Sequence, residues 1–350
     1  MSNRLIEFSK KRALDAIALV LAIVAVGAIA ARNIHARAPL TLLNVSYDPT
    51  RELYAQLNPK FVAEYQKTRG KQVAVEQSHG GSSRQASAVL HGDQQADVVT
   101  LGLPSDVEAL RKHGLIDASW TTRLPNRAQP YHSTVVFVVR RGNPLGIHDW
   151  PDLIKPGIEI ITPDPRSSGN GKLSALAGWG AVRARGGSED DARAYLKNFY
   201  EHTPFLESGA RAAAVAFAVE KLGDVHLTWE NEALREVGEA NGTLEIVYPP
   251  LSIRAEPAVA WVDANVARHD TADVARAYLT YLFSAEAQEI IADTGYRPSD
   301  ERVLARHAAR FPALNLFPIT DIAKDWEDAQ QKFFGEHGIL ETVYRPKPRR

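Results

Sequence analysis

Four short segments of this 350-residue chain place serine, glycine and other small residues where a helix is expected to begin after a strand. They are Ser46-Tyr47-Asp48-Pro49, Ser78-His79-Gly80-Gly81-Ser82, Ser167-Ser168-Gly169-Asn170-Gly171 and Ser208-Gly209-Ala210-Arg211. The first turn of a helix presents unpaired N–H groups and about half a positive charge, which favours an anion. Glycine lets the backbone approach that anion closely, and a serine hydroxyl adds a donor. Ordinary capping of helices by Ser or Asp would also produce such segments, so both interpretations stand at this point.

Strands and helices alternate around these four segments. The expected strands are 42–47, 73–76, 97–101, 133–140, 158–162, 225–228 and 258–262. The expected helices are 49–67, 82–90, 105–112, 170–185, 190–200, 210–221, 271–283, 286–294 and one near 322–334. Alternation of this kind predicts an α/β fold built on largely parallel sheet. In open α/β sheets ligands bind at the carboxyl ends of strands, where the four segments would lie.

Prolines interrupt the pattern twice, near residues 125–130 and at 249–250. Two α/β units with two crossing points predict two lobes joined by a hinge, the chain returning to the first lobe. The expected division is an export segment at 1–38, lobe I at 39–122 plus 251–320, lobe II at 123–250, and a C-terminal helix and tail at 321–350 that pack on the lobes.

The N-terminal residues match an export signal. Four basic residues between positions 4 and 12 precede an uncharged apolar run of sixteen residues, 16–31. Small residues suited to cleavage lie at 28–30 and 36–38. Retention as an inner-membrane anchor is the alternative, although the run falls short of the roughly 20 residues that span a bilayer. In either case the bulk of the chain leaves the cytoplasm, so we expect a periplasmic location.

Composition narrows the classes of ligand. Cysteine is absent, which excludes disulfides, Cys-based metal sites and a lipid-modified cysteine after the signal. Without residues 1–38 the chain has 35 basic and 40 acidic residues, a net charge of −5. No nucleic-acid partner is expected, because affinity for phosphate backbones comes from clustered basic charge. The eleven histidines show no H-E-x-x-H pattern, and we expect neither metal nor cofactor.

Several of these segments resemble the periplasmic sulfate-binding proteins of ABC importers. The sequence LLNVSYDPTRELY (42–54) is similar to the opening strand and helix of that family. QSHGGS (77–82) and TPDPRSSG (162–169) resemble the two signature regions of the family. Further similar segments are 147–150, 152–157, 208–211, 223–225 and 229–233. The resemblance runs in order from about residue 40 to at least residue 298.

The resemblance implies a type II periplasmic binding-protein fold that closes over a dehydrated sulfate and has no enzymatic activity. By position it implies seven neutral donors: the backbone N–H groups of Asp48, Ser82, Gly169, Asn170 and Ala210, the hydroxyl of Ser168 and the indole N–H of Trp229. It also implies supporting roles for Gly81 and Arg211. Without the resemblance, Trp229 would be interpreted as a core aromatic residue and Arg211 as a solvated one.

Selectivity follows from the donors. Sulfate only accepts hydrogen bonds, whereas hydrogen phosphate carries a proton that would stay unpaired, at a cost on the order of 1–3 kcal/mol. The Asp48 carboxylate would repel an anion, so we expect it to cap the helix or to meet a nearby donor. Asn170 stands where sulfate-binding members often have glycine and thiosulfate-binding relatives can carry Asn. Asp164-Pro165-Arg166 and Gly171-Lys172 also depart from the usual Asn-Pro-Lys and Ala-Arg, so thiosulfate stays open as the ligand.

Two other classes of protein are matched only in part. His79-Gly80-Gly81 is similar to the oxyanion loop of a secreted serine hydrolase, but no G-x-S-x-G elbow occurs in the chain. Gly171-Lys172 lacks the earlier glycine and the following Ser or Thr of a P-loop. The partners expected instead are the anion and the permease subunits of an ABC importer. The protein is expected to be a monomer that meets the membrane only through the N-terminal segment or the permease.

Overall fold

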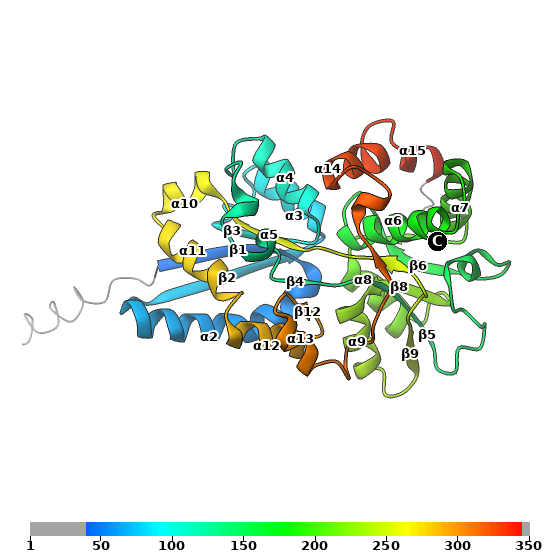
Figure 1. Ribbon diagram of the computed structural model, residues 1–350, viewed down its shortest axis with the longest axis horizontal. Helices are drawn as coiled ribbons and strands as arrows, with labels where there is room; N and C mark the ends of the chain where they lie inside the picture. Colours follow the sequence, from blue (N-terminus) through cyan, green and yellow to red (C-terminus); the bar gives the residue numbers. More distant parts are fainter. Residues whose placement is uncertain (1–39, 345–350) are drawn as a thin grey trace, which may run out of the picture. The chain divides into compact units, whose positions relative to one another are not determined.

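Two β-sheets organise the chain. The computed structural model describes residues 40–344, so the export segment expected at 1–38 lies outside the described residues. The strand order is β11-β3-β1-β2 in the first sheet and β7-β6-β8-β5-β9 in the second. In Figure 1 the labelled strands of the first sheet lie on the left and those of the second on the right. Helices pack on each sheet, as expected for an α/β architecture.

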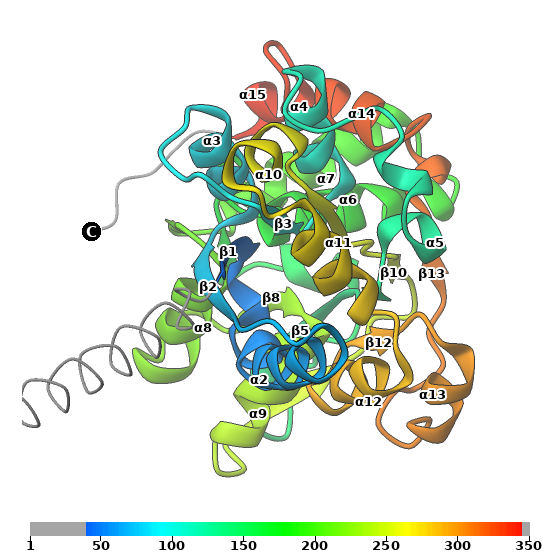
Figure 2. The ribbon, with the colours of Figure 1, turned by 90° about the vertical axis from the view of Figure 1, so that its left-hand side faces the viewer.

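The first sheet has four strands and six helices associated with them. The strands are β1 (Leu40–Tyr47), β2 (Val73–Gly80), β3 (Val98–Leu101) and β11 (Ala258–Trp261). The helices are α2 (Arg51–Arg69), α3 (Ser82–Leu90), α4 (Pro104–Lys112), α10 (Asp263–His269), α11 (Ala272–Tyr281) and α12 (Ala285–Asp293). β1 lies parallel to β3; β3 is wholly buried, and β1 is buried over its last four residues, 44–47. Figures 1 and 2 both show α12 beside α2.

The sequence of α2 shows how one of these helices is specified. Leu57, Phe61 and Tyr65 recur every four residues, which places them on one face, and all three are buried. The helix ends at Gly70, whose φ of 65° is the left-handed conformation that glycine adopts without steric cost. Its first turn follows β1 directly through a 3-10 turn, η1 (Asp48–Thr50). The expected helix at 49–67 is therefore found within two residues of its predicted bounds.

The second sheet has five strands and the central helices of the chain. The strands are β5 (Val135–Arg140), β6 (Ile160–Pro163), β7 (Leu206–Glu207), β8 (Val225–Trp229) and β9 (Leu244–Val247). The helices are α6 (Gly169–Ala184), α7 (Glu189–Glu201), α8 (Ala210–Ala214), a π-helical turn η4 (Val215–Val219) and α9 (Glu230–Glu239). Residues 135–139 of β5 are all buried, since helices cover both faces of this sheet.

The sheets are mixed, which corrects the expectation of largely parallel sheet. β11 is antiparallel to β3 in the first sheet, and β5 is antiparallel to β8 and β9 in the second. Both strands come soon after a segment in which the chain passes from one sheet to the other. A strand that arrives in this way is not joined to its neighbour by a crossover helix, so nothing imposes a parallel direction on it.

Short strands connect the two sheets. β4 (Tyr131–His132) pairs with β12 (Arg297–Pro298), and β10 (Ser252–Ile253) pairs with β13 (Leu316–Phe317). A buried ion pair fixes this region, because the Arg297 guanidinium lies 2.6 and 2.8 Å from the two Glu230 carboxylate oxygens. The remaining helical turns are η2 (Trp120–Thr122), α5 (Pro125–Ala128), η3 (Trp150–Ile154), α13 (Glu301–Arg306) and η5 (Ile319–Asp321).

The C-terminal segment contacts helices of both sheets. It comprises α14 (Trp326–Ala329), a π-helical turn η6 (Gln330–Phe334) and α15 (Ile339–Val343). Glu327 pairs with Lys112 of α4 at 2.5 Å, while the Phe333 ring packs edge-on against Trp179 of α6 at 5.1 Å between centroids. Figure 1 shows α14 and α15 next to α6 and α7. The helix expected near 322–334 is found here as α14 and η6.

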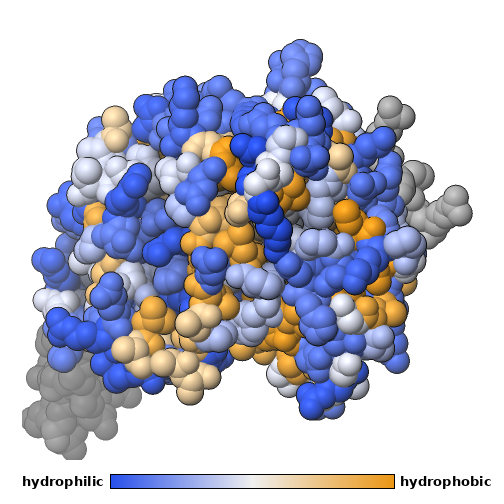
Figure 3. All heavy atoms as spheres, turned by 45° about the vertical axis from the view of Figure 1, so that its right-hand side comes forward, coloured by the Kyte–Doolittle hydropathy of each residue, from blue (hydrophilic) through white to orange (hydrophobic). Residues whose placement is uncertain are grey.

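Polar residues cover much of the surface. Figure 3 shows several groups of hydrophobic residues on one face, separated by hydrophilic ones. Three large apolar side chains are exposed among the described residues: Leu145, Val215 and Val219. Within residues 40–344, no helix combines the length and the apolar character needed to cross a bilayer.

Candidate functional site

The four segments singled out in the sequence all follow the carboxyl end of a strand. Asp48 follows β1, Ser82 starts α3 just after β2, Gly169 starts α6 after β6, and Ala210 starts α8 after β7. Trp229 is the last residue of β8 and precedes α9. Two of these segments come from the first sheet and three from the second. The candidate site therefore draws on the strand ends of both sheets.

Glycines show how closely these segments meet. A Cβ placed on Gly81 would lie 2.3 Å from the Ser167 carbonyl oxygen and 3.2 Å from the Ser208 carbonyl oxygen. A Cβ placed on Gly209 would lie 2.6 Å from Asp48 Oδ2. Only glycine allows the backbone of one segment to lie against another at such distances. The contacts cross from the first sheet to the second, so the loops of the two sheets touch one another.

The predicted donors Ser82, Gly169 and Trp229 also lie where the loops of the two sheets touch. A Cβ on Gly169 would be 3.2 Å from the Cβ of Ser82. A Cβ on Gly102 would be 3.3 Å from Cζ2 of Trp229 and 3.5 Å from the Cβ of Ser82. The Trp229 ring is buried and packs against Tyr47 at 5.3 Å between centroids. The structure thus brings all five segments together, including the tryptophan that sequence spacing alone could not place.

The serines at the site differ in what their hydroxyls do. The Ser82 hydroxyl donates to Asp106 Oδ2 at 2.5 Å and accepts from the Gly102 N–H at 2.9 Å, so only its backbone N–H remains for a ligand. Ser168 is the N-cap residue of α6, but its hydroxyl does not cap that helix. Ser168 is 2% exposed. A buried hydroxyl that does not cap its helix is available as a donor.

Aromatic N–H groups show a similar contrast. Among the described residues the indole N–H groups of Trp120, Trp150, Trp261 and Trp326 each donate to an oxygen of the protein. The buried indole N–H groups of Trp179 and Trp229 make no such hydrogen bond within that part of the chain, and of these two only Trp229 lies among the site segments. Indole is a donor only, so a buried indole of this kind suits an acceptor-only ligand.

The Asp48 carboxylate has a cationic partner. Asp48 Oδ1 accepts from the Arg51 guanidinium at 3.1 Å, which is one of the two roles expected for it. Asn170 uses its side chain to join two parts of the site. Its Nδ2 donates to the Leu227 carbonyl of β8 at 3.0 Å, two residues before Trp229. The Asn170 Oδ1 is buried and has no hydrogen-bond partner among the described residues.

Two ion pairs join the two sheets beside these donors. Lys172 of α6 lies 3.3 Å from Asp106 of α4, and both side chains are buried. Arg211 of α8 lies 2.9 Å from Glu52 of α2 and 3.4 Å from Glu232. Burial raises the pKa of Glu232, while the neighbouring arginines oppose that rise. Arg211 is therefore an ion-paired residue at the contact between the sheets and not a solvated one.

Asp106 and Lys172 are the residues that sequence analysis missed. The sequence pattern places Asp106 in an ordinary helix, and Lys172 stands out only as a departure from the usual Ala-Arg of the family. Asp106 also accepts from the Ser83 hydroxyl at 3.0 Å, so its carboxylate fixes the first turn of α3. One signal in the sequence is Lys172 near the start of α6, where no acidic residue of the first turn offsets its charge.

A serine–histidine contact also lies among these segments. Ser46 Oγ and His79 Nδ1 are 2.8 Å apart. Burial and the charge of Arg51 lower the pKa of His79 to about 4. Ser46 is fully buried, and its hydroxyl donates to the Ser78 carbonyl at 3.4 Å, so it is already engaged within the protein. The contact orders the strand ends and does not form an exposed nucleophile of the kind a hydrolase needs.

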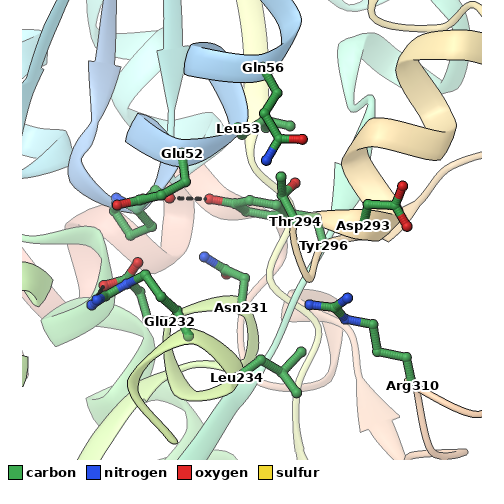
Figure 4. Close-up of a pocket in the computed structure, with 12 residues that line it drawn as sticks. Glu52, Leu53, Gln56, Asn231, Glu232, Leu234, Asp293, Thr294, Tyr296 and Arg310 are labelled. Carbon is green, nitrogen blue, oxygen red and sulfur yellow. Dashed lines mark hydrogen bonds and ion pairs between the residues drawn. The ribbon is translucent and has the colours of Figure 1, made fainter. Parts of the chain in front are cut away.

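A separate cavity of about 190 Å³ lies nearby, between α2, α9 and the end of α12. Figure 4 shows Gln56, Asn231 and Arg310 pointing into it, with Glu52, Glu232 and Asp293 around them. The Tyr296 hydroxyl closes one wall by donating to the Pro49 carbonyl at 2.7 Å. None of the seven predicted donors lines it. The described residues hold no cluster of three or more His, Asp or Glu side chains suited to a metal ion.

The sequence of this chain is similar to those of known solute-binding proteins. Residues 42–297 match the family model described as bacterial extracellular solute-binding protein. The chain is 46% identical over 306 residues to a sulfate-binding protein of Salmonella typhimurium, covering 87% of this chain and 93% of that protein. It is 41% identical over 316 residues to a thiosulfate-binding protein of Pseudomonas aeruginosa, covering 89% and 94%.

A solved structure of the sulfate-binding protein SubI from Mycobacterium tuberculosis is similar to this chain with a TM-score of 0.77 and 31% identity, covering 84% of this chain and 99% of that one. A ferric binding protein from Campylobacter jejuni matches with a TM-score of 0.59 at 15% identity, which supports the fold alone. The two-lobed type II periplasmic binding-protein fold predicted from the sequence is confirmed.

Proposed function

Because the chain belongs to the family of bacterial extracellular solute-binding proteins, we propose that it captures sulfate outside the cytoplasm for an ABC importer. The observation that carries this proposal is the meeting of four helix starts and one indole at the strand ends of both sheets. The proposed ligand contacts are the backbone N–H groups of Asp48, Ser82, Gly169, Asn170 and Ala210, the Ser168 hydroxyl and the Trp229 indole N–H.

These seven donors are neutral, and the four oxygens of a tetrahedral dianion have enough lone pairs to accept from all of them. The first N–H groups of a helix have no partner inside the helix, so a ligand oxygen can accept from them without breaking any bond of the protein. Hydrogen bonds to a charged acceptor each contribute about 1.5–3 kcal/mol. Lys172 and Arg211 are neutralised by carboxylates, so the site would hold the anion by oriented dipoles and not by a free cation.

Selectivity against hydrogen phosphate would follow from the same donors. Asp48 carries the one carboxylate among the seven proposed ligand residues, and its Oδ1 is already engaged by Arg51. A protonated anion would therefore bury an unpaired O–H, at a cost on the order of 1–3 kcal/mol. Thiosulfate is also acceptor-only, and a thiosulfate-binding relative is 41% identical, so it is the competing ligand within this proposal.

Closure of the two lobes would complete the site. Contacts from Gly81 and Gly209 and the two ion pairs all join the sheets, so they exist together only when the lobes meet. Exclusion of water then strengthens the hydrogen bonds to the anion. We propose lobe I as 39–122 plus 251–320, lobe II as 123–250, and 321–350 as a C-terminal segment packed on both. The protein would act as a periplasmic monomer that presents its closed form to the importer permease, with no catalysis.

Isothermal titration calorimetry tests the ligand assignment. Residues 39–350 would be titrated with sulfate, thiosulfate, molybdate and phosphate at pH 7. We expect 1:1 binding of sulfate and no heat from phosphate. Tighter binding of thiosulfate would keep the mechanism and change the ligand. No binding of any of the four anions would refute the proposal.

A pair of glycine variants locates the site. Gly169→Asp places a carboxylate at the proposed anion position, and we expect it to abolish binding. Gly238→Asp is the matched control, because a Cβ on Gly238 meets nothing within 4 Å. Equal affinities of the two variants would show that the anion binds elsewhere.

A further inference from the structure

The three helices that start with small residues at the site share an unusual first turn. α3, α6 and α8 carry no acidic residue there. Other helices of the chain follow the usual preference, with Asp263 at the start of α10, Glu286 in α12 and Glu301 in α13. Acidic side chains are favoured at a helix N-terminus because they face its positive end. Their absence at α3, α6 and α8 leaves that positive end open to a ligand.

A basic residue stands near the start of each of these three helices instead: Arg84 in α3, Lys172 in α6 and Arg211 in α8. A cation there is disfavoured by the helix dipole, so the structure must compensate for it or use it. Lys172 is compensated by Asp106 at 3.3 Å, and Arg211 by Glu52 at 2.9 Å. Arg84 differs, because its side chain makes no ion pair with any residue of the described range 40–344.

Arg84 lies where the loops of the two lobes meet. Its backbone N–H donates to the Ser167 carbonyl oxygen at 3.4 Å, next to the proposed ligand residue Ser168. It comes two residues after Ser82, and its side chain is exposed. The Arg84 side chain therefore starts beside the proposed anion site and is in contact with water.

We infer that Arg84 is the residue that attracts the anion to the open site before the lobes close. This inference rests on the proposed function. A dianion approaching this protein meets a net charge of −5 over residues 39–350, so it needs a local positive potential. The buried donors are neutral dipoles of short reach, whereas an exposed guanidinium acts over about 8 Å at physiological ionic strength. Arg84 speeds entry and leaves the holding of the anion to the donors.

The test separates association from dissociation. Stopped-flow tryptophan fluorescence would follow sulfate binding to residues 39–350 at ionic strengths of about 0.01 M and 1 M. For a dianion about 10 Å from the lost charge, Arg84→Gln should slow association about threefold at low salt and not at all at high salt. The dissociation rate should stay unchanged at both. Arg84→Lys, which keeps the charge, should retain the parent rate.

Arg69→Gln is the matched control. It removes the same charge from an exposed residue at the far end of α2, about 27 Å along the helix from Arg51. It should leave association unchanged. Equal association rates of Arg84→Gln and the parent at low salt would overturn the inference, as would a faster dissociation with unchanged association. A parent protein that binds neither sulfate nor thiosulfate would instead refute the proposed function.

Discussion

Gly81→Ala should hinder the closing of the two lobes on the anion while leaving each lobe intact. Gly81 has φ −60° and ψ 135°, values that alanine adopts freely, so the substitution strains no local backbone. The added Cβ would lie 2.3 Å from the Ser167 carbonyl oxygen, across the contact between the lobes. The clash therefore belongs to the closed arrangement and is absent when the lobes separate.

The size of the effect follows from this distance. Real Cβ contacts essentially never fall below 3.0 Å, so the segments carrying Gly81 and Ser167 must separate by at least 0.7 Å. Overpacking of this kind costs about 1–3 kcal/mol, and stretched donor bonds to the anion add to it. A total of about 2–4 kcal/mol corresponds to a roughly 30- to 1,000-fold weaker affinity for sulfate.

Calorimetry with sulfate measures this loss, and Gly80→Ala supplies the control. A Cβ on Gly80 meets only the Gln85 side chain, at 3.2 Å, and that side chain can move aside. We expect Gly80→Ala to bind within a few-fold of the parent and both variants to keep the melting temperature of the ligand-free protein. Parent-like affinity in Gly81→Ala would refute the claim that binding requires this contact between the lobes.

Three further predictions concern charged groups. Lys172→Met leaves the Asp106 carboxylate without its partner on the other lobe, so calorimetry should show sulfate binding weakened about 10- to 100-fold. Adding Asp106→Asn should restore part of the affinity. If it restores none, the two residues are not directly coupled. Arg297→Met strands the buried Glu230 charge and should lower the free energy of unfolding by about 3–5 kcal/mol in urea, a result that an unchanged midpoint would contradict. Burial and two nearby arginines lower the pKa of His132 to about 3, below its unfolded value near 6.5, so the unfolded state binds more protons between these values. Stability should therefore be complete above about pH 6.5 and fall as the pH drops towards 3, and His132→Gln should flatten that fall; equal slopes in the two proteins would count against it.

Local sequence signals predicted the architecture well where one face of an element is apolar. The helix expected at 82–90 is α3 with the same bounds, since its buried positions recur at helical spacing. α9 was missed, because the buried residues Glu230, Glu232 and Glu236 make its inward face charged. Ala233, Leu234 and Val237 do recur at helical spacing, but the buried glutamates between them obscured that pattern, and tertiary ion pairs make the burial of these glutamates tolerable.

The sequence predicts those parts of the site that lie at the ends of strands and the starts of helices. Glycine and serine at successive strand ends marked the four segments, and the structure brings these together with Trp229. The pairing of Lys172 with Asp106 could not be read from the chain, because 66 residues separate them and nothing local specifies the contact. The direction of β5 was also beyond local signals, since it depends on where the chain passes between the sheets.

Anion contact with the seven donors is the central claim, and a crystal structure of residues 39–350 with selenate tests it most directly. Selenate matches sulfate in charge and geometry, and the anomalous signal of selenium locates it without ambiguity. We predict a single strong anomalous peak at the meeting of the five segments, with its oxygens about 2.7–3.2 Å from the Ser168 hydroxyl, the Trp229 indole N–H and the backbone N–H groups of α3, α6 and α8. A peak in the cavity beside Arg310, or at surface arginines only, would contradict the account.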